Sequence, residues 1–219
     1  MIEPKQIIRS NRKSIALVIN NKGELIVRAP RAVSQAQIMN FVGRKQAWIK
    51  EKTDIYKKND EKYAVITMSA GDKVFFLGKD YTLVSSDVSD IVMEGMVMYI
   101  PQNSNVKSLR DWLKKNALLL LKERTQYYAQ GMDVVPHSVK ISEAKTRWGS
   151  CSPDNSINYS WRLIMCPLPV IDYVVVHELS HITQKDHSKA FWSRVETVLP
   201  NYKEQRNWLK INRKLMDVI

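Results

Sequence analysis

Three of the chain's four histidines lie within eleven residues, and this cluster constrains the fold more than any other feature of the sequence. His177 and His181 are four residues apart, so on an α-helix they lie one turn apart on one face, where both imidazoles can reach one metal ion. Glu178 lies beside them, placed to take a proton from a metal-bound water. The cluster predicts a hydrolytic metal site, and the alternative is a surface helix with coincidental histidines.

The third histidine, His187, adds a geometric requirement. Six more residues of helix would place it about 240° around the axis from His181, on the wrong side for a shared metal. We therefore expect the helix to end near residues 184–186, with Asp186 at the turn because aspartate tolerates the left-handed conformation. Ser188 is expected to cap a following helix. Three histidine ligands leave one coordination position of zinc open, which is typical of a catalytic site.

The net charge of +12 is distributed unevenly along the chain. Residues 1–60 contain 13 Lys and Arg against 5 Asp and Glu, a net +8, whereas residues 61–110 carry −1 and residues 111–219 carry +5. A basic N-terminal region is typical of surfaces that contact DNA or another polyanion, and such a contact is one interpretation of this region. The alternative is a solvated face that keeps the protein in solution, because no recognised nucleic-acid motif accompanies the charge.

Length and composition favour a folded protein without a membrane anchor. A chain of 219 residues with 44% hydrophobic residues buries a core as one large domain or two small ones. We expect neither a leader peptide nor a membrane span, because no apolar stretch is placed or long enough for either. Two cysteines are too few for a disulfide framework, so the expected location is cytoplasmic and the expected state of both thiols is reduced.

The spacing of apolar and turn residues predicts an α+β chain. In residues 1–105 we expect a basic, β-hairpin-rich N-terminal part with one helix. The expected hairpins pair 14–19 with 24–28, 73–77 with 81–85, and 91–93 with 96–100. The expected helix starts after Ser34, which forms a capping box with Gln37, and it runs to Ile49. The charged stretch 50–62 is predicted to leave that helix as a loop.

Residues 106–219 are predicted to form a zincin-like catalytic domain. Its expected elements are a long helix over 106–130, a small antiparallel sheet from 138–142, 145–150 and 156–163, a histidine-bearing helix from residue 170, and one or two closing helices. Two arrangements stay open at this point. The N-terminal part is either a separate domain or packs with the catalytic part as one body.

Four segments of the C-terminal half together resemble one known family. They are Lys145-Thr-Arg-Trp-Gly-Ser-Cys151, Ile157-Asn-Tyr-Ser-Trp-Arg-Leu163, Asp172-Tyr-Val-Val-Val-His-Glu-Leu-Ser-His181 and His187-Ser-Lys-Ala-Phe-Trp192. With these segments the chain resembles the YgjP-like metallopeptidase family, which is related to the SprT-like HExxH zinc metalloproteases. The resemblance implies a zinc ion held by His177, His181 and His187. It also implies Glu178 as the general base and hydrolysis of peptide bonds in a protein or peptide substrate.

Six further residues are candidates for contacts with the substrate: Arg147, Trp148, Gly149, Ser150, Asn158 and Arg162. The resemblance implies that the strand with the first four lies beside the cleft. Asn158 and Arg162 lie on one alternating face of the next predicted strand, where either could stabilise a developing oxyanion or form a salt bridge elsewhere. An extended substrate could add as a strand to the edge of this sheet.

Other functions stay open at the level of the sequence. The metal could serve a hydrolase of a nucleotide phosphoanhydride or another non-peptide substrate, with basic side chains holding the phosphates. The chain has no glycine-rich phosphate loop, which weighs against that alternative. A zinc-stabilised binding module without activity would leave Glu178 without a role. The SprT-like relatives suggest a peptidase that acts near DNA, and the sequence does not determine the oligomeric state.

Overall fold

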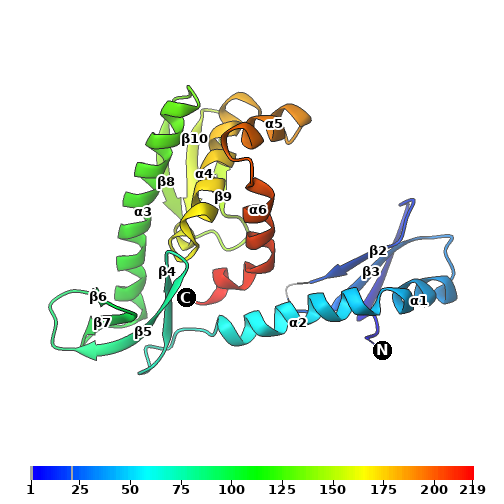
Figure 1. Cartoon of the computed structure of the whole chain (residues 1–219), viewed down its shortest axis with the longest axis horizontal. Helices are drawn as coiled ribbons and strands as arrows, with labels where there is room; N and C mark the ends of the chain where they lie inside the picture. Colours follow the sequence, from blue (N-terminus) through cyan, green and yellow to red (C-terminus); the bar gives the residue numbers. More distant parts are fainter. Residues whose placement is uncertain (1, 21) are drawn as a thin grey trace. The chain divides into compact units, whose positions relative to one another are not determined.

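The computed structural model describes residues 2–20 and 22–219, and it is α+β as expected (Figure 1). Its contacts divide the chain into two compact units. Unit 1 comprises Met1–Ala64 and Ile211–Lys214, and unit 2 comprises Val65–Lys210 and Leu215–Ile219. The division falls at residue 64 and not at the predicted boundary of 105, because the strands that follow residue 72 contact the catalytic part.

A three-stranded sheet forms one layer of unit 1. Its order is β1 (Gln6–Ser10), β3 (Leu25–Pro30) and β2 (Ala16–Ile19). The antiparallel pairing of β2 with β3 confirms the first predicted hairpin. In its turn Gly23 has a positive φ of 73°, which glycine adopts readily. Asn21 of the predicted turn lies outside the described residues. The parallel pairing of β1 with β3 was not predicted, because nothing local in the sequence marks a partner that far along the chain.

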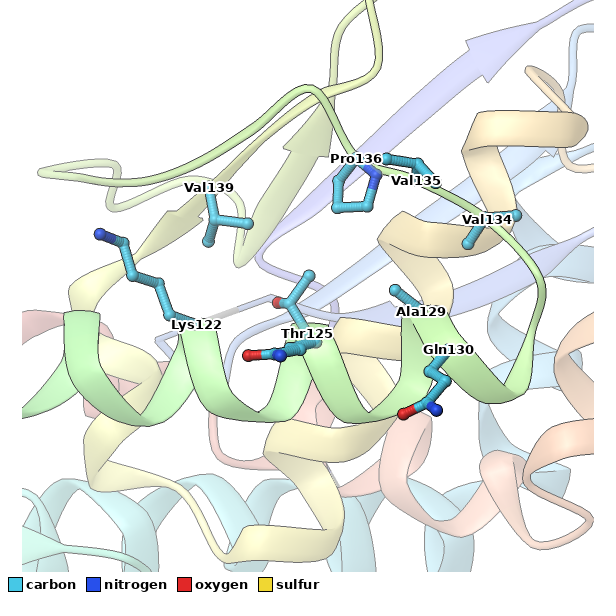
Figure 2. A pocket seen from close by; sticks show the side chains of 9 residues that line it. Lys122, Thr125, Ala129, Gln130, Val134, Val135, Pro136 and Val139 are labelled. Carbon is cyan, nitrogen blue, oxygen red and sulfur yellow. The ribbon is translucent and has the colours of Figure 1, made fainter.

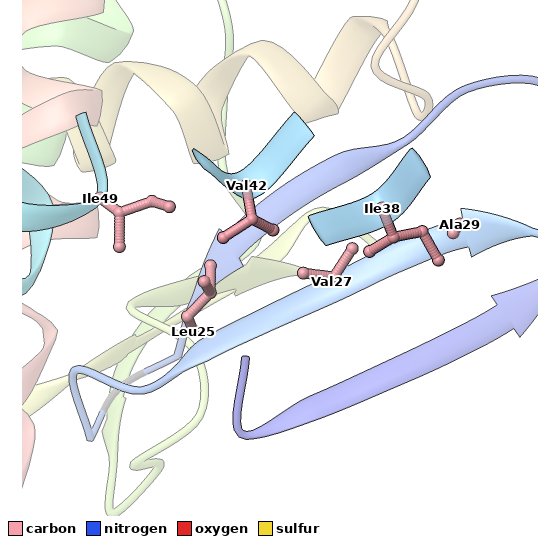
Figure 3. Close-up of a cluster of buried hydrophobic side chains, with 6 residues drawn as sticks. All are labelled: Leu25, Val27, Ala29, Ile38, Val42 and Ile49. Atoms are coloured by element: carbon pink, nitrogen blue, oxygen red, sulfur yellow. The ribbon is translucent and has the colours of Figure 1, made fainter. Parts of the chain in front are cut away.

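Two helices, α1 (Gln35–Arg44) and α2 (Gln46–Lys62), form the other layer of unit 1. The predicted capping box of Ser34 and Gln37 opens α1. Figure 3 shows the core between the layers, in which buried side chains of β3 face those of the helices: Leu25, Val27, Ala29, Ile38, Val42 and Ile49.

The prediction of a loop over 50–62 is wrong, because α2 continues through this charged stretch. Thr53 and Asn59 lie on the buried side of the helix, and the Asn59 side-chain amide donates a 2.7 Å hydrogen bond to the main-chain oxygen of Ile211. This partner is 152 residues away in the sequence. Contact with a distant segment therefore stabilises a helix where the charged composition alone predicts a solvent-exposed loop.

The second sheet belongs to unit 2 and explains the boundary at residue 64. Its order is β4 (Lys73–Phe76), β5 (Lys79–Ser86), β7 (Val97–Pro101) and β6 (Val92–Glu94), so both remaining predicted hairpins are confirmed. At the β4–β5 turn, the amide of Leu77 donates to the main-chain oxygen of Ile164 at 2.7 Å. The amide of Gly78 donates to that of Met165 at 3.2 Å. These bonds join the hairpin to the catalytic part.

The rest of unit 2 follows the predicted order of elements. The long helix α3 (Val106–Gly131) is followed by the strands β8 (Ser138–Ser142), β9 (Gly149–Cys151) and β10 (Ser156–Ser160) and by the short 3₁₀ helix η1 (Trp161–Met165). The sheet has the order β8-β10-β9, and it is mixed and not antiparallel throughout, because β8 pairs with β10 in parallel. Helices α4 (Leu168–Thr183), α5 (Lys189–Val198) and α6 (Tyr202–Ile211) and the 3₁₀ helix η2 (Arg213–Asp217) close the chain.

Helix α3 is joined to α4 and to the small sheet by polar contacts. Arg124 of α3 forms a two-fold hydrogen-bonded ion pair with Asp172 of α4, at 2.7 and 2.9 Å. The hydroxyls of Thr125 on α3 and Tyr159 on β10 lie 3.1 Å apart in the buried interior. α3 is therefore joined by polar contacts both to α4 and to the small sheet. None of the helices in the described part of the chain is long and apolar enough to cross a membrane.

Candidate metal centre

Helix α4 places two of the three clustered histidines. His177 and His181 lie one helical turn apart, and their ring centroids are 5.0 Å apart. The helix ends at Thr183, and Gln184 takes an extended conformation with φ −127° and ψ 97°. The predicted end of the helix near residues 184–186 is confirmed, since α4 stops at Thr183 and Gln184 is its C-cap.

The chain then turns back toward α4 and starts a new helix. Among the described residues Asp186 does not have a positive φ, so the predicted left-handed turn is wrong. Instead the Asp186 carboxylate accepts a 3.1 Å hydrogen bond from the amide of Ser188. The Ser188 hydroxyl accepts a 3.4 Å bond from the amide of Phe191, as the predicted N-cap of α5. These two bonds fix residue 187 between the helices.

The turn brings the third histidine to the other two. One ligand atom from each of His177, His181 and His187 lies within 4.8 Å of the others, and Nε2 of His187 is 3.2 Å from Nε2 of His177. Phe191 is fully buried, and its ring centroid lies 4.5 to 4.8 Å from all three imidazole centroids. Three nitrogens converging over an apolar floor fit a single metal ion of the zinc type.

Hydrogen bonding and burial prepare these imidazoles for a metal. Nδ1 of His181 lies 2.9 Å from the main-chain oxygen of Gln184, so this nitrogen carries the hydrogen and Nε2 keeps a free lone pair. Burial, and then the neighbouring His181 and His187, lower the pKa of His177 to about 3. Burial likewise lowers the pKa of His181, against the effect of its bond to Gln184. The neutral imidazole, which is the form that binds metals, is therefore favoured.

Glu178 is buried next to the histidine cluster. Its side chain is 5% exposed, and burial raises its pKa to about 8, while the positive charge of Arg147 opposes that rise. The carboxylate packs against Gly149 of β9. A Cβ atom on residue 149 would lie 2.6 Å from Oε1 of Glu178, so only glycine leaves room for the carboxylate in this position. α4 and β9 thus position Glu178 together.

Comparison with known proteins assigns the chain to a family. Residues 13–212 match the family described as YgjP-like, metallopeptidase domain. The chain belongs to this YgjP-like family. It is therefore a metallopeptidase, and its family implies a catalytic metal.

A solved structure with some likeness to the YgjP-like chain is the crystal structure of the metallopeptidase zymogen of Pyrococcus abyssi abylysin. The identity is 21%, the likeness covers 41% of this chain and 90% of that chain, and the TM-score is 0.38. Such a low score carries nothing further about this molecule. No curated protein matches the chain.

The four predicted residues near β9 have different surroundings in this YgjP-like protein. Arg147 is exposed and close enough to Glu178 to influence its pKa. The main-chain oxygen of Trp148 accepts a 2.8 Å bond from the amide of Ser160, which holds the segment against β10. Ser150 pairs with Asn158 across the strands, and strand alternation places both on the sheet face opposite to Gly149. A contact between these residues and a substrate stays a prediction.

The structure corrects the expectation for Arg162. This residue lies in η1 and not on a strand, its side chain is 2% exposed, and its guanidinium donates to the main-chain oxygens of Glu143 and Ile219 at 3.3 and 3.0 Å. The same group packs 4.4 Å over the ring of Trp161. It also lies 3.6 Å from the carboxylate of Glu143, so the structure shows the alternative of a salt bridge elsewhere, and Arg162 anchors the C-terminal end of the chain in the core.

Sequence reasoning missed a row of side chains from α5 and α6 beside the histidines. The ring centroid of Trp192 lies 5.7 Å from that of His187, and Trp192 stacks on Tyr202 at 5.3 Å. The guanidinium of Arg206 lies 4.5 Å from the ring centroid of Trp192 in a cation–π contact. Tyr202 also stacks on Tyr173 of α4 at 6.3 Å. No spacing in the sequence relates residues of α6 to the histidines, because only the packing of α6 on α4 and α5 brings them there.

A separate hollow of about 520 Å³ lies between α3 and residues 134–139 (Figure 2). Thr125, Ala129, Val134 and Val139 are among its lining residues, and none of its lining residues is a histidine or an acid. The hollow therefore offers no ligand set for a metal, and it is distinct from the cluster of His177, His181 and His187.

Proposed function

We propose that this protein is a zinc-dependent metallopeptidase in which His177, His181 and His187 hold the zinc and Glu178 is the general base. The observation that carries the proposal is the convergence of three imidazole nitrogens within 4.8 Å beside a buried glutamate, in a chain of a metallopeptidase family. Three nitrogen ligands favour zinc over magnesium or calcium, which prefer oxygen. Bound zinc supplies a Lewis acid that polarises a carbonyl and lowers the pKa of water.

The chain's own contribution to the chemistry is the handling of the proton by Glu178. Its carboxylate accepts the proton of the attacking water and passes it to the leaving amine. Because Glu178 is 5% exposed, bulk water does not compete for this proton. Gly149 restricts the carboxylate from the β9 side, which limits the positions that it can take.

The edge of the small sheet supports an extended peptide as the substrate. β9 lies at one end of the order β8-β10-β9, and among the described residues no strand pairs with its outer side. A peptide that added to this side would form main-chain hydrogen bonds whatever its sequence. It would run alongside Gly149, which contacts Glu178. This arrangement supports peptide-bond hydrolysis with broad sequence tolerance.

The test uses Glu178→Gln in the full chain. We expect the variant to bind close to one equivalent of zinc but to degrade unfolded, fluorescein-labelled casein at least about 1000-fold more slowly, since general-base catalysis contributes 10²–10⁴-fold. Undiminished turnover by Glu178→Gln would contradict the proposed mechanism. Turnover of nucleoside triphosphates without turnover of casein would favour the phosphoanhydride alternative.

The ligand set is tested with the fourth histidine as a matched control. His187→Ala should weaken zinc binding at least about tenfold, because it removes one of three ligands. His137→Ala should bind zinc as the unaltered protein does, since His137 is exposed and lies outside the cluster. An equal loss in both variants, or in neither, would remove His187 from the ligand set.

A further inference from the structure

An edge strand of unit 1 runs beside a groove that the peptidase site does not use. β2 lies at one end of the order β1-β3-β2. Within the described residues its main-chain groups hydrogen-bond only to β3, so the outer side of residues 16–19 is unpaired. An unpaired strand edge is a template on which another extended chain can add.

The wall of the groove is one stripe of the two helices. Gln37, Phe41, Arg44, Lys45 and Trp48 follow helical spacing, and they line hollows on the side of β2. Trp48 is 38% exposed although it is a large aromatic residue. The groove therefore has an apolar base with polar and basic groups at its rim.

Two hollows divide this groove at a spacing that suits alternate side chains of a strand. One hollow of about 290 Å³ is lined by Leu17, Phe41, Lys45 and Trp48. The other, of about 310 Å³, includes Ile15 and also Phe41 in its lining. Ile15 lies just before β2 and Leu17 lies within it, and two residues of extended chain correspond to about 7 Å. Residues i and i+2 of an added strand have the same spacing, so each could fill one hollow.

The charge of unit 1 selects among extended chains. Unit 1 contains 16 Lys and Arg against 6 Asp and Glu, and between residues 4 and 50 there are ten Lys and Arg against the single acid Glu24. Arg44 and Lys45 line the two hollows, no acidic residue lines either one, and neither cation has an ion pair in the described part of the chain. The groove therefore favours negatively charged partners.

We propose that the groove between β2 and helices α1 and α2 binds an extended polypeptide segment that adds to β2 as a further strand, with apolar side chains in the two hollows and acidic side chains facing Arg44 and Lys45. Strand addition supplies affinity through main-chain bonds, and the hollows supply selectivity through alternate side chains. The inference stands on unit 1 alone and does not depend on the peptidase activity.

Polypeptide fits these observations better than nucleic acid. The net charge alone would suit any polyanion, including the DNA that the sequence leaves open as a partner. An unpaired strand edge and two apolar hollows at side-chain spacing are features that phosphate binding does not require. Nucleic acid is therefore the competing outcome of the experiment.

The probe is a fluorescein-labelled ten-residue peptide of alternating glutamate and valine, and binding is followed by fluorescence anisotropy. The protein is the full chain with Glu178→Gln, so that the probe is not cut. Two further probes carry N-methyl groups on the amides of the odd or of the even residues. An added strand pairs through every second residue, so one of these two probes should bind at least about tenfold more weakly and the other should bind nearly as the parent does.

Matched charge reversals locate the binding. Arg44→Glu with Lys45→Glu should weaken the peptide complex at least about tenfold, because it reverses the rim of the groove. Lys57→Glu with Lys58→Glu makes the same change of charge at exposed positions of α2 that line neither hollow, and it should change binding less than about twofold. Trp48→Ser should weaken binding without a change of charge. Circular-dichroism melting confirms that each variant is folded.

Three results would overturn the inference. Equal loss with both charge-reversed pairs would show diffuse electrostatic attraction. Equal binding of both N-methylated probes would exclude strand addition. Tighter binding of single-stranded DNA than of the peptide, with competition between them, would assign the groove to nucleic acid. Failure of the casein assay would affect none of these measurements, and the substitutions at Arg44, Lys45 and Trp48, all in unit 1, distinguish binding at this groove from binding at β9.

Discussion

Unit 1 and unit 2 use charge in opposite ways. Unit 1 has a net charge of +10, whereas the 18 Lys and Arg of unit 2 are nearly balanced by 16 Asp and Glu. The buried polar residues of unit 1 among those described are the uncharged Thr53, Asn59 and Asn212. Unit 2 instead buries ionisable groups: Arg162, Asp172 and Glu178.

The contrast indicates that unit 1 is suited to attracting charged partners and unit 2 to proton transfer. Charges at a surface attract partners over a distance but keep their ordinary chemistry because water solvates them. A buried ionisable group is costly and has a shifted pKa, which is what proton transfer at neutral pH requires. The burial of Glu178 lowers the stability of the folded protein, whereas the cations at the surface of unit 1 carry no such cost. Four predictions test this division, in order of decreasing effect.

Phe191→Ala should cause the largest loss, because the ring is fully buried beneath all three imidazoles. We expect a fall of about 3–5 kcal/mol in the free energy of unfolding. Zinc affinity should also fall, because the three imidazoles lose the ring on which they pack. Leu113→Ala removes an equally buried side chain of α3, and it should cost a comparable amount measured by urea unfolding while zinc affinity stays within twofold. A Phe191→Ala protein with unaltered zinc affinity would contradict the role of the ring.

Metal-free Glu178→Gln should be more stable than the metal-free unaltered protein at pH 8, by a few kcal/mol. Glu178 has a folded pKa of about 8, raised by burial, so below pH 4 both folded and unfolded states are protonated and no penalty exists. As the pH rises toward 8, only the unfolded state releases the proton, and folding becomes less favourable. Urea unfolding with a chelator at pH 4.5, 6.5 and 8 measures the difference in free energy of unfolding between the variant and the unaltered protein. A difference that does not grow with pH would contradict it.

Gly149→Ala should lower kcat/KM about 100-fold, because the new methyl group would lie 2.6 Å from Oε1 of Glu178 and displace the carboxylate. Gly131→Ala is the control, since nothing lies within 4 Å of its added Cβ. That control should keep full activity. Full activity of Gly149→Ala on casein would show that Glu178 tolerates displacement, and that the activity of unit 2 does not depend on the buried position of this carboxylate.

The smallest effect compares matching helix caps in the two units. Ser188→Ala and Ser34→Ala each remove a hydroxyl that caps a helix, and each should cost about 1 kcal/mol of stability. Only Ser188→Ala should also weaken zinc binding, because the bond that the Ser188 hydroxyl accepts from the amide of Phe191 fixes the chain next to His187. Isothermal titration with zinc separates the two. Equal zinc affinities would mean that the turn holds His187 without its cap.

Much of the candidate site could be predicted because its signals are local. The spacing of His177, Glu178 and His181 on one helix and the required end of that helix follow from the geometry of a single element. The capping positions of Ser34 and Ser188 are likewise local. Predictions failed where a distant partner decides the outcome. Arg162 reads as a strand residue near the cleft, yet the main-chain oxygen of Ile219 draws it into the core.

Most of the elements and the cluster of His177, His181 and His187 could be predicted from the chain alone, because hydrophobic period, caps and turn residues act over a few positions. The sequence also determined the unequal charge of the two halves. Tertiary structure alone decided the parallel pairing of β1 with β3, the helix through residues 50–62 and the assignment of the hairpins over 73–101 to unit 2. It also decided the row of Trp192, Tyr202 and Arg206 beside the metal site. The physical reason is that these features depend on contacts between segments far apart in the chain, whose energies no local pattern encodes.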